Sequence, residues 1–419
     1  MRKTMRVILI TLSALAALAP AHLLAVTPAV LIGPDLKPRE VMLQTFAGGK
    51  ITYFDADRTL QIESTTKLLQ IRMVHEDAQS DDTLNPGTTP KPETSSVPGT
   101  RTINQAATPV EEPQAAQVVA LARLDLIDGQ RIIARWTGAS DDGQKLTFEH
   151  DTLGKLTVSL EVVSRFMLDG SAAGGATPAS DRVLLSNGDA LEGFVSAIGQ
   201  TTVDVQIGSN KPIALPIERV RGLVLANPQR LPDKPRDVVM LRDGSRLAAG
   251  TVSIEQDRLN MMVSLAGDKP VAVDTKAVAR VELASPKGRL VDLAELPMKV
   301  IDGGDVFGLA LPPRVEGDAI RLHAPMTAEF ELPANAKRFA ATAELHASGP
   351  GAEWANFILS LRAAGTQVAR QAISHKEPGA AINVELNGRS LTLILDPSTD
   401  GPIMDRLRLR EAVVYVERE

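Results

Sequence analysis

The chain has 419 residues, of which 44% are hydrophobic and 23% charged, a length and composition that fit about two to four globular domains. Its formal net charge of −6 offers no basic surface of the kind that nucleic acid requires. Aromatic residues make up only 3% of the chain, so ring faces for stacking on bases or sugars are scarce. Cysteine is absent, which excludes disulfides, thiolate metal sites and thiol catalysis.

Residues 1–25 have the pattern of a secretory signal peptide. Three basic residues precede an apolar run from Val7 to Leu18, and small residues follow, with cleavage expected after Ala25. The alternative is a signal anchor, in which the apolar stretch extends through Leu24. With the signal removed no membrane span remains. We therefore expect an exported protein of the periplasm, cell surface or extracellular space.

Residues 76–117 are rich in Pro, Thr and Ser and carry few apolar residues. Such a composition cannot bury enough surface to offset its ordering entropy, so it predicts a disordered linker. Residues 26–75 before it are interpreted as a degenerate small β module that lacks a clean Asp-Gly turn. We expect the linker to leave this first module loosely tethered.

Three further modules are predicted at residues 118–170, 180–227 and 236–285, because turn and closing strand recur at matching distances. The turn glycines are Gly129, Gly188 and Gly244, and the closing strands begin at Val163, Val220 and Val278, which are 34, 32 and 34 residues further on. A glycine after Asp or Asn supplies the positive φ of a tight hairpin turn. A repeated spacing of this kind indicates structural repeats.

Within each module apolar residues alternate with polar ones over short runs, which predicts half-buried antiparallel strands. The units resemble Sm-like or SH3-like small β-barrels, with an apolar strand, a turn containing Gly, and a second strand containing Gly193 or Gly250. Barrels of this type serve many functions, so the resemblance assigns none. Negative charge and export both argue against the nucleic-acid role of Sm-like proteins.

From residue 290 to 419 about seven short strands separated by turns predict a β-sandwich. This segment resembles NPCBM, a family of carbohydrate-binding modules that have a jelly-roll fold and occur beside glycosidases and in exported bacterial proteins. The resemblance is carried by three stretches: Gly317 to His323, Phe330 to Phe339, and Val384 to Leu395. It implies a jelly roll that binds a glycan.

The sequence departs from that family at two places. The family's Asp-Trp pair falls on Arg408-Leu409, and its acidic turn reads His346-Ala347-Ser348-Gly349-Pro350. Sugar sites use carboxylates to accept hydroxyl protons and an aromatic face for the C–H surface of the ring. The jelly roll could therefore be kept while sugar binding is lost.

The candidate ligand-binding residues are His323, Trp354, Asp400 and Asp405. His323 could bind a sugar hydroxyl or fasten a loop, and Trp354 could stack on a sugar or cover the core. Asp396, Asp400 and Asp405 could hold a structural calcium ion, or satisfy the backbone of their turn. No other cofactor is expected. Trp136 is interpreted as a core or groove residue of its barrel.

No pair of acids stands out as catalytic, and the six histidines show no metal-type spacing. We therefore expect a non-enzymatic protein whose C-terminal domain binds a glycan. The alternative is a protein-interaction scaffold of the cell envelope, built on strand edges of the barrels, with sugar binding lost. An uncharacterised hydrolase is a third alternative, since carbohydrate modules often accompany catalytic domains.

Overall fold

The computed structural model describes residues 26–74, 121–171, 178–230 and 236–418, apart from short gaps at 256, 264, 266–268, 307, 317–318, 348–350, 398–400 and 403. The expected cleavage at Ala25 and the expected linker at 76–117 lie outside these residues. Within them, regular structure consists of antiparallel strands and single 3-10 turns, so the all-β prediction is confirmed. The described residues contain no helix long and apolar enough to cross a membrane.

The first twenty strands form four units of five strands, which we call modules 1 to 4 (26–74, 121–168, 181–225 and 237–283). The strands of modules 1 and 2 are β1 (Thr27–Ile32), β2 (Pro38–Ala47), β3 (Lys50–Phe54), β4 (Leu60–Ser64), β5 (Gln70–Met73), β6 (Ala122–Leu126), β7 (Arg131–Ala139), β8 (Lys145–His150), β9 (Gly154–Ser159) and β10 (Val163–Met167). Those of modules 3 and 4 are β11 (Asp181–Leu185), β12 (Ala190–Ile198), β13 (Thr202–Gln206), β14 (Ile213–Pro216), β15 (Val220–Val224), β16 (Asp237–Leu241), β17 (Arg246–Glu255), β18 (Arg258–Val263), β19 (Lys269–Asp274) and β20 (Val278–Glu282).

In every module the first strand pairs with both the second and the fifth, and the third and fourth strands extend the sheet. The turn glycines Gly129, Gly188 and Gly244 have φ of 85°, 93° and 92°, as the turn requires. In module 1 Leu36 takes this place, with φ of 53°. Among the described residues no pairing joins the fourth strand to the fifth, so closure into a small barrel stays a prediction.

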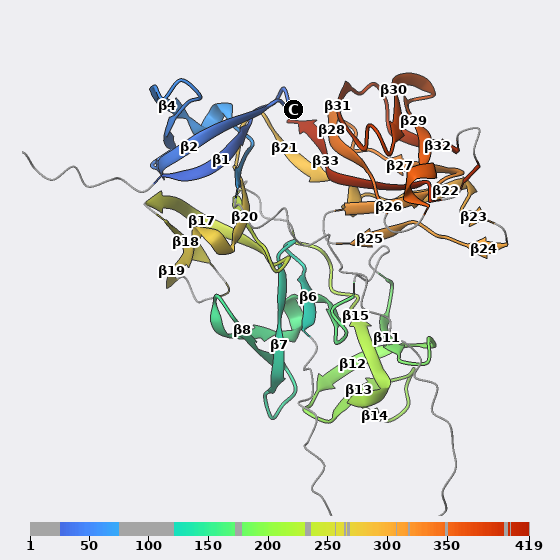
Figure 1. The fold of residues 1–419 in the computed structure, drawn as a ribbon. Helices are drawn as coiled ribbons and strands as arrows, with labels where there is room; N and C mark the ends of the chain where they lie inside the picture. The colour runs from blue at the N-terminus through green and yellow to red at the C-terminus, as the bar shows by residue number, and fades with distance from the viewer. Residues whose placement is uncertain are drawn as a thin grey trace, which may run out of the picture.

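The modules associate in pairs through their fifth strands. β20 of module 4 pairs with β5 of module 1, with Val281 opposite Ile71, and β10 of module 2 pairs with β15 of module 3. Each pair shares one continuous apolar core. Figure 1 shows modules 1 and 4 at the left, continuing through module 2 to module 3 at the lower right. The expectation that module 1 is loosely tethered is therefore wrong, because strand pairing to a module far along the chain fixes it.

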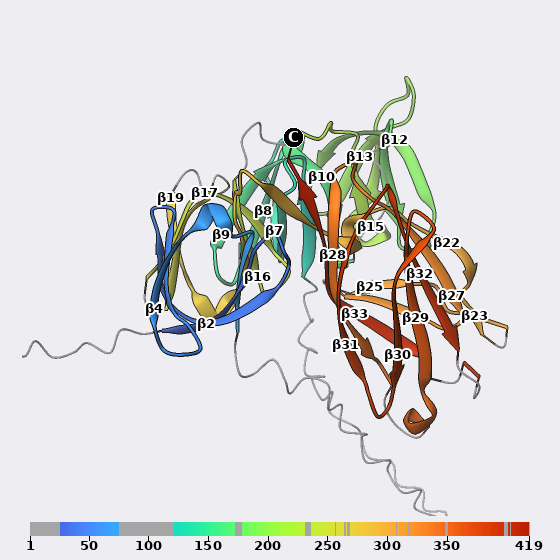
Figure 2. The same cartoon turned by 90° about the horizontal axis from the view of Figure 1, so that it is seen from above.

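The C-terminal residues 288–418, which we call the sandwich, form two facing antiparallel sheets (Figure 2). One sheet has β25 (Arg314–Glu316), β26 (Ala319–His323), β33 (Arg406–Glu417), β28 (Ala336–Leu345) and β31 (Gly379–Glu385) in that order, with β21 (Gly288–Asp292) also paired to β33. The other has β22 (Met298–Gly303), β27 (Met326–Glu331), β32 (Ser390–Pro397), β29 (Asn356–Ala363) and β30 (Thr366–Ser374), and a small hairpin joins β23 (Asp305–Val306) to β24 (Leu309–Ala310).

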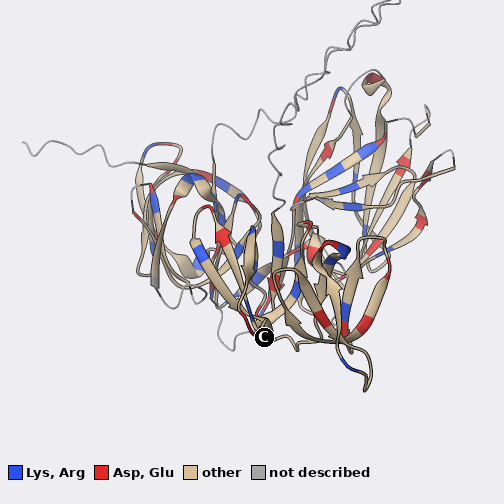
Figure 3. Cartoon of the chain, turned by 90° about the horizontal axis from the view of Figure 1, so that it is seen from below, with Lys and Arg blue, Asp and Glu red and all other residues tan. Residues whose placement is uncertain are grey.

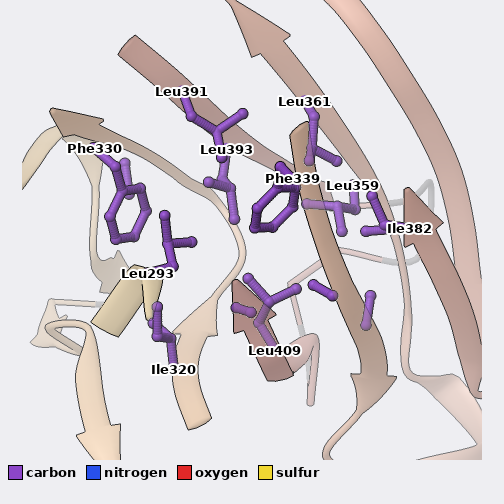
Figure 4. Close-up of a cluster of buried hydrophobic side chains, with 14 of the residues drawn as sticks. Leu293, Ile320, Phe330, Phe339, Leu359, Leu361, Ile382, Leu391, Leu393 and Leu409 are labelled. Atoms are coloured by element: carbon purple, nitrogen blue, oxygen red, sulfur yellow. The ribbon is translucent and has the colours of Figure 1, made fainter. Parts of the chain in front are cut away.

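Alternation along these strands directs one face of each sheet inward. Phe330, Phe339 and Leu393 are among the fully buried side chains that meet between the sheets (Figure 4). The predicted β-sandwich is confirmed, and its sheet arrangement is consistent with a jelly roll.

Module 1 packs against the sandwich. Val30 and Leu69, which face outward from module 1, are buried with Leu290, Val413 and Tyr415 of the sandwich. An ion pair joins the Arg72 guanidinium to the Glu411 carboxylate at the same contact. The sandwich is thus one part of a larger packed body.

Candidate ligand-binding site

One end of the sandwich collects most of the residues that the sequence singles out. His323 ends β26 opposite Arg406, the first residue of β33, and Phe357 near the start of β29 lies opposite Pro397 at the end of β32. Gly303 at the end of β22 lies opposite Met326 at the start of β27. The connections after β22, β26, β28, β30 and β32 therefore all emerge at the same end, which we call the loop end.

A pocket of about 460 Å³ opens at the loop end. It is lined by Asp302, Gly303, Asp305, Pro325, Met326, Thr327, Leu395 and Asp396. Met326 and Leu395 are buried core residues that form its floor, whereas the three aspartates are exposed around its rim. Carboxylates around an apolar floor can accept hydroxyl protons from a polar ligand that also presents C–H groups.

Gly303 lies between Asp302 and Asp305 in the sequence and allows both aspartates to flank the pocket. Its φ is 85°, and a Cβ at this position would collide with the carbonyl oxygen of Pro325. The backbone N–H of Gly303 donates a 2.9 Å hydrogen bond to Oδ1 of Asp302, which orients that carboxylate. Sequence reasoning missed Asp302 and Asp305, because their place beside Asp396 depends on the pairing of β22 with β27.

Trp354 presents its indole ring at the loop end. It lies in the 3-10 turn η8 (Ala352–Trp354) before β29 and is 60% exposed. Its Nε1–H donates a 3.1 Å hydrogen bond to Oε1 of Glu353, and the backbone N–H of Gly351 donates to Oε2. The pKa of Glu353 is lowered by its own backbone N–H, then by Trp354, Gly351 and the charge of His375, so the carboxylate stays ionised. The bond holds the edge of a ring that remains largely exposed.

Two candidates from the sequence face inward. His323 is 9% exposed, and its Nδ1–H donates a 2.6 Å hydrogen bond to the carbonyl oxygen of Ala324. Asp405 is fully buried, its Oδ1 accepts a 2.8 Å hydrogen bond from the backbone N–H of Asn356, and its carbonyl oxygen accepts one from the N–H of Ala324. Both side chains thus hold the loops together rather than line the pocket.

Of the three aspartates predicted to hold calcium, two are described, so the calcium site stays a prediction. Asp396 is exposed at the pocket, Asp405 points into the loop, and Asp400 falls in the gap at 398–400. Across the described residues no three His, Cys, Asp or Glu side chains converge as a metal site would require. Trp136 is half-buried and packs edge-on against Phe166, with ring centroids 5.7 Å apart, as a core residue does.

A histidine, an aspartate and a serine also meet between modules 2 and 4. Nε2 of His150 lies 3.1 Å from both Asp243 Oδ2 and Ser245 Oγ, while its Nδ1 accepts from the backbone N–H of Thr152 at 3.0 Å. A catalytic triad needs the carboxylate on one ring nitrogen and the nucleophile on the other. With both groups on Nε2 and His150 only 1% exposed, this cluster joins the modules. His150 precedes Asp243 by 93 residues and Ser245 by 95, and this separation in sequence hid the cluster.

Basic and acidic residues are interspersed over most of the described strands (Figure 3). On the sandwich, however, Arg314, Arg321 and Arg408 lie side by side across β25, β26 and β33.

No family model matches the chain, and no curated protein does. Among solved structures, it is similar to the CBM51-2 and INT domains of Clostridium perfringens ZmpB, with 13% identity, 39% of this chain and 37% of that chain covered, and a TM-score of 0.26. The same CBM51-2 with GlcNAc is matched over 44% of its length. The chain thus spans less than half of the first structures it matches.

Two further matches are also to CBM51 modules. The CBM51 of Clostridium perfringens GH95 with methyl-galactose is 12% identical and has a TM-score of 0.23, with 30% of this chain and 99% of that chain covered. The tandem CBM51 modules of Streptococcus pneumoniae Sp3GH98 are 11% identical and have a TM-score of 0.27, with 70% and 88% covered.

Proposed function

We propose that this chain is an exported, non-catalytic protein that binds a glycan at the loop end of its sandwich. The observation that carries the proposal is the pocket there, in which Asp302, Asp305 and Asp396 surround a floor of Met326 and Leu395. A sugar presents hydroxyl groups and C–H faces together, and this combination of acceptors and apolar surface suits both. The exposed indole of Trp354 at the same end adds a stacking face.

The acid–base pattern supports the non-catalytic part. Glycoside hydrolysis needs two carboxyl groups about 5–10 Å apart, one of them with a raised pKa to serve as acid. Among described residues, burial raises the pKa of the carboxyl groups of Asp237 and Glu282, and both belong to module 4 rather than to the pocket. Arg246 and Arg280 oppose this rise at Glu282.

The alternative is a scaffold for protein partners, with sugar binding lost. A specific feature favours it: β22 is an edge strand, and its Val300 and Ile301 are exposed. An uncovered strand edge with apolar side chains can accept an added strand. Glycan binding requires the side chains at the loop end, whereas a scaffold requires the exposed edge of β22. One experiment can therefore separate the two functions.

The experiment is a glycan-array screen of residues 26–419, kept whole because module 1 buries part of the sandwich. Wild type is compared with Trp354→Ala and with Glu385→Gln, which removes an exposed carboxylate at the opposite end of the sandwich. The proposal expects a glycan signal that Trp354→Ala weakens and Glu385→Gln leaves unchanged. A blank array, with partners crosslinked through β22, would favour the scaffold.

A further inference from the structure

The contact between modules 2 and 4 is reciprocal. Arg131 of β7 lies opposite Arg246 of β17, and these residues hold the same place, two positions after the turn glycine of each module. The N–H of Ile133 donates a 2.9 Å hydrogen bond to Ser245 Oγ, and the N–H of Ala248 donates a 3.0 Å bond to Gln130 Oε1. The acceptor in each bond follows the turn glycine directly, and each donor lies four positions after the glycine.

Two kinds of contact therefore alternate along the modules. Fifth strands join module 1 to 4 and module 2 to 3, and hairpin edges join module 4 to 2. The spatial order is 1–4–2–3, so modules 1 and 3 stand at the two ends. Each end module carries the same hairpin edge. In module 1 the far end of β2 already pairs with β17 of module 4, and Asn383 of the sandwich donates to the carbonyl oxygens of Asp35 and Leu36 at the turn. In module 3 the strand pairing of the described residues places no other module against residues 190–193.

The edge of module 1 is unsuited to this contact. Lys37 stands where the acceptor is required, and its ammonium can only donate. Pro38 follows, and it lacks the N–H that an edge strand offers to a partner. A lysine and a proline are devices by which proteins block edge pairing.

The edge of module 3 keeps every group that the contact uses. Asp189 supplies the acceptor, and its Oδ2 accepts a 2.7 Å hydrogen bond from the side-chain amide of Asn187. In module 2 the acceptor residue Gln130 is held in a similar way, because its side-chain amide donates to Asp128. Glu192 supplies the N–H, and its carboxylate is neutralised by Arg182 at 2.8 Å. Ala190, at the place of the paired arginines, is small enough to let two edges approach.

Exposed apolar side chains also indicate that the hairpin edge of module 3 has no covering partner among the described residues. Leu191 is only half-buried, whereas Ile132 and Leu247, its counterparts in modules 2 and 4, are fully buried. Phe194, four residues after Ala190, is 61% exposed. Large exposed side chains beside an unpaired strand edge are typical of an interaction site.

We propose that a second copy of this chain docks on the hairpin edge of module 3, with Ala190 opposite Ala190 of the other copy. The groups are self-complementary, because Asp189 of each copy would accept a hydrogen bond from the N–H of Glu192 of the other copy. Within the chain, Gln130 accepts from the N–H of Ala248 and Ser245 from the N–H of Ile133 in the same way. A two-fold contact of this kind closes after two copies. It goes beyond glycan binding and would double the number of glycan sites per particle.

Crosslinking tests the register directly, because the chain has no cysteine and a single introduced thiol can bond only to another copy. Directly opposed residues of antiparallel strands have Cα atoms about 4.5–5.5 Å apart, within the separation that a disulfide spans. Ala190→Cys in residues 26–419 is expected to give a crosslinked dimer under mild oxidation. Ser209→Cys, exposed on another loop of module 3, is the control for random collision. Equal yields from the two variants would overturn the proposal.

Sedimentation tests association without crosslinking. A contact of this small size is expected to associate weakly, so the dimer fraction should rise between about 1 and 100 µM. The double variant Asp189→Lys with Ala190→Pro installs the residues of module 1, whose own fold accommodates Pro38, and should stay monomeric. Glu161→Lys changes an exposed charge by the same amount on module 2 and should still dimerise. Wild type that stays monomeric over this range, or a double variant that dimerises equally, contradicts the proposal.

Discussion

Asp405 accepts a 2.8 Å hydrogen bond from the backbone N–H of Asn356, and this bond ties the chain entering β33 to the start of β29. Asp405→Ala would remove the acceptor of this partly buried N–H, at a cost of about 1–3 kcal/mol. Thermal unfolding of residues 26–419 should show the loss. Asp396→Ala, an exposed aspartate of the same loop end, should change stability by less than about 0.5 kcal/mol. Equal melting temperatures for the two variants would show that Asp405 has no such role.

His323 makes stability depend on pH in the acidic range. Burial and the nearby charge of Arg406 lower its pKa from 6.5, although its hydrogen bond to Ala324 raises it. The unfolded chain therefore takes up a proton more readily than the folded chain. The stabilisation is present above pH 6.5 and is lost as the pH falls through the folded pKa. Melting temperatures at pH 7 and pH 5 should differ less for His323→Gln than for wild type, and an unchanged difference would refute the effect.

Module 1 should remain bound when the chain is cut between Val74 and Leu121. Its contacts to module 4 and to the sandwich are strand pairs and buried apolar side chains, which do not depend on chain continuity. A protease site inserted between these residues gives two fragments, which we expect to coelute in size-exclusion chromatography. They should coelute even at about 1 M salt, because screening weakens ion pairs more than apolar contacts. Separate elution of the two fragments in native buffer would show that module 1 is only loosely tethered, as the sequence alone had suggested.

Much of the architecture is local and was predictable. Gly129, Gly188 and Gly244 mark hairpin turns because positive φ restricts the residue type, and alternation then identifies the strands around them. Module 1 seemed degenerate only because Leu36 occupies the glycine's conformation. A leucine carries no turn signal, although the surrounding pairing forces the same turn.

The long-range features were not predictable in the same way. The association of module 1 with module 4 joins Ile71 to Val281, and nothing in either strand identifies the other. At the loop end, the exposed Trp354 was found because tryptophan is rare here, whereas Asp302 and Asp305 resemble ordinary turn acids until pairing sets them beside Asp396. His323 and Asp405 were singled out by type, but their burial depends on how the loops fold back.

The central claim is tested most directly by calorimetric titration of residues 26–419 with the glycan that the array selects. The account predicts saturable binding that weakens at least about tenfold, or about 1.4 kcal/mol, in both Trp354→Ala and Asp396→Asn, with melting temperatures unchanged. Both side chains are exposed, so loss of binding would not reflect unfolding. Binding that both variants retain at wild-type affinity would contradict a glycan site at the loop end.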